Sequence, residues 1–196
     1  MSASELVKEF SLKNILKKLS ENRFIWIFSF SVLTAVSAQF TVPVKPVPFT
    51  LQTMAVLLSG AFLGSRKGAL SQVIYLALGI LGLPVFAQTP GGAIGFERLI
   101  GPTGGYLLAF PIAAFITGFL IEMNKSYVIV VSSMFIGSLI IIVMGALFLN
   151  TFFIRDFSEA VKAGAAIFSV WTVIKVFAAA TIYFGITKKN IKKSKT

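Results

Sequence analysis

Long stretches without a charged residue dominate this chain and limit what it can fold into. A bilayer core is about 30 Å thick, so a spanning helix needs roughly 20 mostly apolar residues. Lipid offers no water to unpaired backbone groups, so such runs form helices, and none alternates as the strands of a membrane barrel do. Runs free of Asp, Glu, Lys and Arg cover residues 24–44, 46–65, 68–96, 99–121 and 126–154, and a sixth, 163–187, is interrupted only by Lys175. We therefore expect an all-α polytopic integral membrane protein with six transmembrane helices in a single domain, 1–196.

The composition excludes most enzyme and metal chemistry. Charged residues make up only 13% of the chain, roughly half of the ~25% that is usual in soluble domains. There is no Cys and no His, which removes disulfides, thiolates and the commonest metal ligands. No Gly-Lys-Ser/Thr phosphate loop is present. The seven acidic residues all lie outside the centres of the spans, which argues against a proton-driven transporter. We predict no enzyme activity, no metal and no cofactor.

The net charge of +11 is explained by topology and does not indicate a nucleic-acid partner. Basic residues flank the apolar runs, as the positive-inside rule describes. With six spans and an internal N-terminus, four basic residues between spans fall outside: Lys45, Arg98, Arg155 and Lys162. The internal set is much larger: Lys8, Lys13, Lys17, Lys18, Arg23, Arg66, Lys67, Lys125, Lys188, Lys189, Lys192, Lys193 and Lys195. We therefore place both termini in the cytoplasm and the protein in the cell membrane, with the basic tail (187–196) touching anionic membrane lipid.

The segments before and within the first apolar run carry two patterns that each have two interpretations. Residues 1–23 are amphipathic at helical spacing, which indicates an interfacial helix on the cytoplasmic face or a partner-docking segment. The six-helix bundle then occupies 24–186. Small residues at four-residue spacing allow another helix to approach closely, either inside the bundle or at a partner interface. They lie in the first span, about 24–42: Ser31, Thr34, Ala35 and Ala38.

Prolines and glycines divide the next segments. Pro43, Pro46 and Pro48 end the first helix. A second span at about 49–64 is short, which suggests that part of it is buried in protein. A tight inner turn at 65–67 leads to a third span at 68–82. Five of the sixteen glycines fall within 91–104, which predicts an outer loop acting as a lid or a re-entrant segment. The remaining spans are expected at 105–121, at 127–149 and up to about 186.

Lys175 is the one formal charge inside a predicted span. A cation there costs at least ~2.5 kcal/mol on insertion scales, so it normally faces a cavity or a counter-charge. One interpretation is an anchor for an anionic ligand. The other is a side chain that snorkels to the outer surface, if the last span begins near Ile167.

Further polar and aromatic residues are expected at the same outer level. Together they could form a pocket with a cation, hydrogen-bonding groups and aromatic walls, as ligand sites usually have. Taken singly, Tyr106 could instead belong to an interfacial belt, and Gln52 could make a hydrogen bond between helices. The set comprises Thr50, Gln52, Phe86, Gln88, Arg98 and Tyr106.

Three ordered motifs carry a resemblance to a known family. The first is Val47-Pro48-Phe49-Thr50-Leu51-Gln52-Thr53 followed by Gly60-Ala61-Phe62-Leu63-Gly64. The second is Tyr75-Leu76-Ala77-Leu78-Gly79 leading to Gly82-Leu83-Pro84-Val85-Phe86-Ala87. The third is Gly101-Pro102-Thr103-Gly104-Gly105-Tyr106-Leu107. In order and spacing they resemble the BioY family, the biotin-specific substrate-binding (S) components of energy-coupling factor (ECF) transporters, most strongly over residues 30–121.

The resemblance implies a six-helix S-component bundle that captures biotin at the outer face. Its implied partners are a transmembrane coupling protein and two ATPase subunits, with the small-residue face of the first span as the docking surface. The carboxylate of biotin would meet Lys175 or Arg98, its rings Phe86 and Tyr106, and its ureido group Gln52, Gln88 or Thr172.

One departure from the family pattern bears on the ligand. The family commonly has an Asp three residues before the Lys of the last span, where this chain has Thr172. A Thr hydroxyl can still accept a hydrogen bond. Alternatives are an S component for another small anionic vitamin or precursor, a solitary permease, or a membrane scaffold.

Overall fold

The part of the chain that the structure describes contains six helices of twelve or more residues. A computed structural model describes residues 22–42, 47–87 and 94–193, so most of the predicted amphipathic lead-in lies outside the described residues. The long helices are α2 (Arg23–Gln39), α3 (Gln52–Leu63), α4 (Ser65–Ile80), α6 (Gly104–Met123), α7 (Tyr127–Leu149) and α8 (Phe157–Lys193). The connecting elements are β1 (Thr41–Val42), β2 (Phe49–Thr50), α5 (Glu97–Ile100) and the π-helical turn η1 (Asn150–Ile154).

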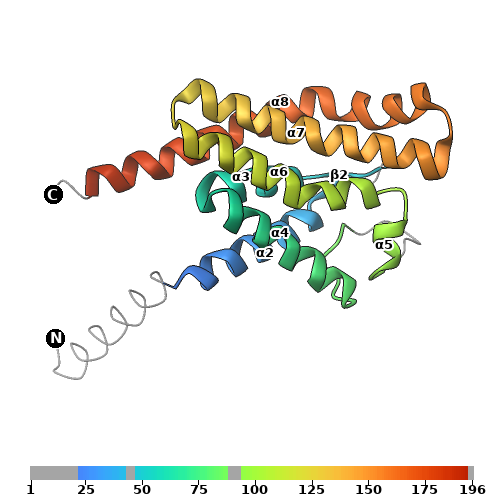
Figure 1. Cartoon of the computed structure of the whole chain (residues 1–196), viewed down its shortest axis with the longest axis horizontal. Helices are drawn as coiled ribbons and strands as arrows, with labels where there is room; N and C mark the ends of the chain where they lie inside the picture. The colour runs from blue at the N-terminus through green and yellow to red at the C-terminus, as the bar shows by residue number, and fades with distance from the viewer. Residues whose placement is uncertain (1–21, 43–46, 88–93, 194–196) are drawn as a thin grey trace.

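The helices are arranged around α3, which packs on α2, α4, α6, α7 and α8. In Figure 1, α7 and α8 lie on one side of the molecule and α2 and α4 on the other, with α3 and α6 between them. At 1.5 Å per residue, the 12 residues of α3 span only about 18 Å. A helix shorter than the bilayer is tolerated here because other helices surround it, so the backbone at its ends is buried in protein and does not face lipid.

Three described helical segments are long and apolar enough to cross a membrane: Gly104–Met123, Tyr127–Ile154 and Val170–Thr187. Two shorter apolar helices, α2 and α3, accompany them. The predicted limits of the fifth apolar helix, Tyr127 and Leu149, are confirmed. The mainly helical, membrane-spanning character of the chain agrees with the sequence prediction.

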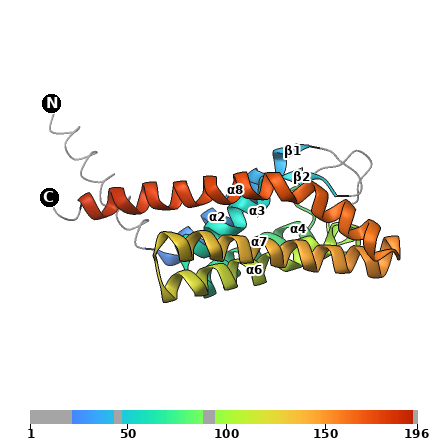
Figure 2. The same cartoon turned by 90° about the horizontal axis from the view of Figure 1, so that it is seen from above.

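Three local predictions need correction. The prolines after α2 do not simply end a helix, because β1 and β2 pair as a short antiparallel ribbon, Thr41 opposite Thr50; Figure 2 shows this ribbon beside α8. Residues 65–67 are not a turn but the first turn of α4. The predicted outer loop also contains the short helix α5.

The reversal between α3 and α4 takes place at one residue, Gly64. Its φ of 80° lies in the left-handed region that glycine adopts at little cost. Glu122, at the end of α6, then caps α4: its carboxylate accepts from the Ser65 N–H at 2.9 Å and from the Ser65 hydroxyl at 2.8 Å. A carboxylate at a helix N-terminus is favoured by the helix dipole, so this cap fixes α3, α4 and α6 at one end of the bundle.

The small residues of α2 face the bundle interior. The Ser31 hydroxyl donates to the Ser71 carbonyl of α4 at 2.6 Å, and Thr34 exchanges hydrogen bonds with Gln72. Ser31, Thr34 and Ala38 have no exposed surface, and Ala35 packs against the apolar core. The close approach predicted from their spacing therefore occurs with α4 of the same chain. The burial of Ser31 and Thr34 against α4 favours the interpretation of packing inside the bundle, and a partner interface at Ser31, Thr34, Ala35 and Ala38 stays a prediction.

Candidate ligand-binding site

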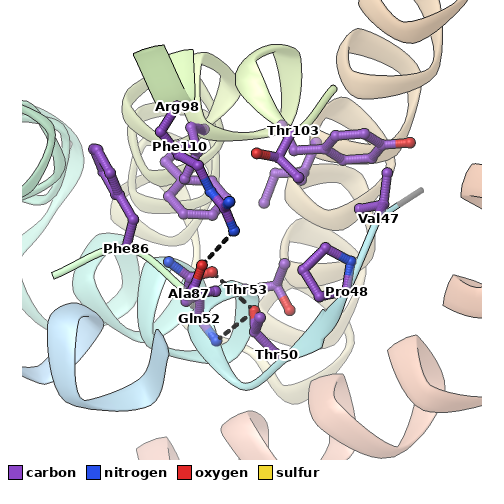
Figure 3. Close-up of a pocket in the computed structure, with 13 residues that line it drawn as sticks. Val47, Pro48, Thr50, Gln52, Thr53, Phe86, Ala87, Arg98, Thr103 and Phe110 are labelled. Atoms are coloured by element: carbon purple, nitrogen blue, oxygen red, sulfur yellow. Dashed lines mark hydrogen bonds between the residues drawn. The ribbon is translucent and has the colours of Figure 1, made fainter. Parts of the chain in front are cut away.

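A cavity lies at the end of the bundle where the β ribbon meets α5 and the start of α6 (Figure 3). The space open to the centre of a water molecule is about 40 Å³, so the cavity is narrow. Its polar lining comes from Thr50, Gln52, Thr53, Arg98, Thr103 and Tyr106. Its apolar lining comes from Val47, Pro48, Phe86, Ala87, Leu107, Phe110 and Ile141. A small organic ligand would have to move some of these side chains apart.

Arg98 supplies the positive charge of the cavity. It stands on the four-residue helix α5 and is 8% exposed. Its guanidinium points into the cavity and donates to the Ala87 carbonyl (Figure 3). Burial lowers the pKa of Arg98, an effect that the nearby Tyr75 hydroxyl opposes, but guanidinium groups remain protonated in proteins. The cavity therefore holds a desolvated cation, which favours a ligand that carries negative charge.

A hydrogen-bonded set fixes the amide of Gln52 at the cavity wall. The amide nitrogen donates to the Tyr75 hydroxyl, and the amide oxygen accepts from the Thr50 hydroxyl at 3.0 Å. The Tyr75 hydroxyl in turn donates to the Val85 carbonyl at 3.2 Å. Tyr75 is itself fully buried, with its ring 5.5 Å from that of Phe86. One orientation of the amide is thereby selected before any ligand arrives.

Tyr106 is a core residue and not a member of an interfacial belt. It is 4% exposed, and its ring lies directly against Gly145 of α7. A Cβ at Gly145 would come within 2.2 Å of a Tyr106 ring carbon. Glycine at this position therefore lets α7 accommodate the ring, which forms one wall of the cavity.

Lys175 lies next to the cavity but does not line it. Its ammonium donates to the Thr50 carbonyl at 3.0 Å and to the Thr53 hydroxyl at 2.9 Å. At 6% exposure it is buried, so the alternative of snorkelling to the surface is wrong. In this structure Lys175 joins α8 to β2 and α3, and it supports two residues of the cavity wall from behind.

The structure thus brings together five of the eight predicted site residues: Thr50, Gln52, Phe86, Arg98 and Tyr106. Lys175 is one layer behind them. Thr172 is half-buried and is not part of the lining. Gln88 lies outside the described residues.

Sequence reasoning missed Thr53, Thr103 and Tyr75. Each of them stands within one of the three sequence motifs, next to a residue that was chosen or in the same run. The signal was therefore present, but nothing in the sequence showed which motif side chains turn inward.

Comparison with known proteins decides the family. A match to the BioY family covers residues 11–192. The chain belongs to the BioY family. The resemblance drawn from the three motifs is thus confirmed, and those motifs lie in the segments that form the cavity.

Curated BioY relatives match over most of their length. "Biotin transporter BioY" of Thermotoga maritima is 39% identical over 164 residues, which is 84% of this chain and 95% of the relative. "Probable biotin transporter BioY" of Pyrococcus horikoshii is 41% identical over 153 residues, 78% of this chain and 88% of the relative. These relatives are transporters and not enzymes.

A solved structure shares the fold. The crystal structure of "the S-component for biotin from an ECF-type ABC transporter" superposes with a TM-score of 0.77 and covers 96% of this chain and 95% of its own. Sequence identity is 22%, so this likeness establishes the fold. The BioY chain described here therefore has the S-component architecture.

Proposed function

We propose that this BioY protein is the high-affinity substrate-binding membrane subunit of a biotin uptake transporter. The observation that carries the proposal is near full-length similarity to biotin transporters together with a cavity lined mostly by residues of the motifs that define the resemblance. The cavity combines one buried cation, amide and hydroxyl groups, and aromatic walls. Biotin offers a carboxylate, a ureido group and an apolar ring system that match these three kinds of group.

The arrangement of the cavity suggests how biotin is held. Arg98 is the cation that points into the cavity, so we assign it the carboxylate of biotin. Gln52 and the adjoining hydroxyl of Thr50 can bond the ureido group, because amides and hydroxyls both donate and accept. Phe86 and Tyr106 would enclose the rings. Lys175 would hold the Thr50 and Thr53 wall in place and would not contact the carboxylate.

The membrane arrangement belongs to the same proposal. We infer that residues 1–196 form one domain with six transmembrane helices and both termini in the cytoplasm. Arg23, Arg66, Lys67 and Lys125 lie at the end of the bundle opposite the cavity, which the positive-inside rule assigns to the cytoplasm. The cavity then opens toward the outer face of the cell membrane. Delivery of biotin would use an ECF transmembrane coupling protein and two ATPase subunits.

Binding of radiolabelled biotin and of its neutral carboxamide to the purified protein tests the function and the role of Arg98. The wild type should bind biotin tightly and the carboxamide more weakly. Arg98→Met should weaken the binding of biotin and leave the binding of the carboxamide almost unchanged, so that the protein binds the two ligands with similar affinity. Arg66→Met, a change of the same chemistry at the far end, is the control and should keep the wild-type preference.

Absence of biotin binding by the wild type would refute the assignment. A thermal-shift panel of small anionic vitamins and precursors would then identify an alternative ligand, because a ligand that binds only the folded state raises the melting temperature. Co-purification of coupling and ATPase subunits separates an S component from a solitary permease or a scaffold, which need no such partners.

The topology can be tested with single cysteines, because the natural chain has none. Ser126→Cys lies in the connection between α6 and α7, and Thr151→Cys lies in η1. A membrane-impermeant maleimide added to whole cells should label Thr151→Cys and not Ser126→Cys. The reverse pattern would invert the proposed orientation.

A further inference from the structure

Two of the aromatic side chains that line the ligand cavity pack against glycines of the helices behind them. Phe86 follows α4, and the tip of its ring points at Gly79 of that helix. Tyr106 stands in the first turn of α6, and its ring lies against Gly145 of α7. A Cβ on Gly79 would come within 2.0 Å of Cζ of Phe86, and a Cβ on Gly145 within 2.2 Å of Cδ1 of Tyr106. Each ring therefore occupies space that a side chain on the helix behind it would fill.

The two glycines approach the cavity from opposite sides of the bundle. In Figure 1, α4 and α7 lie on opposite sides of α6, and α6 packs against both of them. Phe86 is 7% exposed and Tyr106 is 4% exposed, and Phe86 also contacts the ring of Tyr75, with ring centroids 5.5 Å apart. Neither ring can retreat further from the cavity, because helix backbone stands directly behind it. The depth at which these rings pack therefore limits the width of the cavity.

Alanine in place of either glycine would push the ring in front of it toward the cavity. Carbon atoms pack best at about 3.5–4.0 Å, so the ring of Phe86 would have to move by roughly 1.5 Å. The space in the cavity that is open to the centre of a water molecule is only about 40 Å³, so the cavity cannot absorb this movement without becoming smaller. Alanine is also the better helix former, so the substitution favours the helices themselves and its cost falls on the rings.

We propose that Gly79 and Gly145 set the width of the cavity and thereby select a ligand with a fused pair of rings. The inference rests on the proposed function, in which Phe86 and Tyr106 enclose the rings of biotin. Neither glycine lines the cavity, so both are positioning residues that act through the aromatic rings. Biotin has a ureido ring fused to a sulfur-containing ring, whereas desthiobiotin keeps the ureido ring and the carboxylate but lacks the second ring. A narrower cavity therefore discriminates against biotin more than against desthiobiotin.

Binding of radiolabelled biotin to the purified protein, with unlabelled desthiobiotin as the competitor, measures the Kd of both ligands. Gly79→Ala and Gly145→Ala should each raise the Kd for biotin by roughly tenfold, which is within the range of costs that overpacking produces. The Kd for desthiobiotin should rise by a smaller factor. The preference of the protein for biotin over desthiobiotin should therefore decrease in both variants.

Gly137 supplies the matched control, because it is another closely packed glycine of α7. Its Cβ would lie 2.3 Å from Oγ1 of Thr117 and 2.7 Å from Cδ2 of Leu57, and neither of these residues lines the cavity. Gly137→Ala should leave the Kd of both ligands unchanged in the folded protein. A rise in the Kd for biotin equal to that of Gly145→Ala would overturn the proposal, because crowding anywhere in the core would then have the same effect.

A double-mutant cycle shows whether Gly79 acts through the ring of Phe86. The three atoms of Phe86 nearest to the added Cβ are Cζ, Cε2 and Cε1, and leucine has none of them. Phe86→Leu and the double variant Phe86→Leu with Gly79→Ala should therefore bind biotin with equal Kd. This comparison also decides the question if Gly79→Ala alone does not fold. A roughly tenfold difference between the two, the full effect expected of Gly79→Ala, would mean that Gly79 acts by another route and would overturn the proposal.

Failure of this inference can be distinguished from failure of the proposed function. Unchanged biotin affinity in either Gly79→Ala or Gly145→Ala, or equal losses of affinity for biotin and desthiobiotin, would refute the role of the glycines and leave the biotin assignment intact. Absence of biotin binding by the wild type would instead refute the proposed function, and the inference with it.

Discussion

Removal of the single hydroxyl of Tyr75 should weaken ligand binding although Tyr75 does not line the cavity. The Tyr75→Phe variant keeps the ring in place against Phe86 and Phe110, whose ring centroids lie 5.5 Å and 6.3 Å away. The lost hydroxyl is the acceptor for the Gln52 amide and the donor to the Val85 carbonyl. Tyr75 therefore acts as a positioning residue for Gln52.

The size of the effect follows from those two hydrogen bonds. A buried donor left without its acceptor costs about 1–3 kcal/mol. The free amide of Gln52 can rotate away from the cavity to find another partner, and ligand binding must then return it to its original orientation. A cost near the lower end of this range, about 1.4 kcal/mol, corresponds to a tenfold higher Kd.

The Kd for radiolabelled biotin, measured on purified Tyr75→Phe protein, gives this quantity directly. Tyr127→Phe is the matched control, because it removes the same hydroxyl from a tyrosine that is 57% exposed at the start of α7. It should bind biotin with wild-type affinity. A double-mutant cycle with Gln52→Ala shows whether Tyr75 acts through the amide. In the Gln52→Ala background, the further change Tyr75→Phe should have little additional effect.

Equal affinities for wild type, Tyr75→Phe and Tyr127→Phe would refute the argument that the amide of Gln52 is oriented from behind. Additive losses in the double-mutant cycle would also refute it, because they would mean that Tyr75 affects binding without Gln52.

Three other changes test the packing and the support of the site. Lys175→Met should weaken the binding of biotin and of its neutral carboxamide by the same factor, roughly tenfold, because the charged hydrogen bonds to the cavity wall are lost. A loss of affinity confined to biotin would instead place the ammonium at the carboxylate. Gly60→Ala should lower the unfolding free energy by about 1–3 kcal/mol, since its Cβ would lie 2.3 Å from a carbonyl oxygen of α6. Gly185→Ala, with nothing within 4 Å of the new Cβ, should change it by no more than about 1 kcal/mol, and fluorescence-monitored thermal unfolding compares the two. Glu122→Ala removes the cap on Ser65 and should cost about 1 kcal/mol in the same assay; an unchanged transition would mean that the cap contributes nothing.

The sequence alone determined the class of protein and the family. The length of an apolar run is a local property, and the bilayer converts it into a helix, so the approximate limits predicted for α7 agree with the structure. The three motifs are also local, and they identified the BioY family. Four of the five predicted residues that line the cavity stand within them, and the fifth, Arg98, lies between the second motif and the third. The ribbon of β1 and β2 could not be predicted in this way, because its pairing joins residues across a proline-rich connection.

Only the tertiary structure decided which way the side chains face. In a soluble helix, polar and apolar faces reveal which side is buried, but in lipid both faces are apolar. On α7, for example, Met134 is fully buried and Leu139 is 58% exposed, although both are apolar. The same ambiguity left Ser31 and Thr34 open to packing inside the bundle or to a partner interface, and the structure shows both in contact with α4. It also left the position of Lys175 open, and the structure shows its ammonium bonded to Thr50 and Thr53 of the cavity wall without lining the cavity itself.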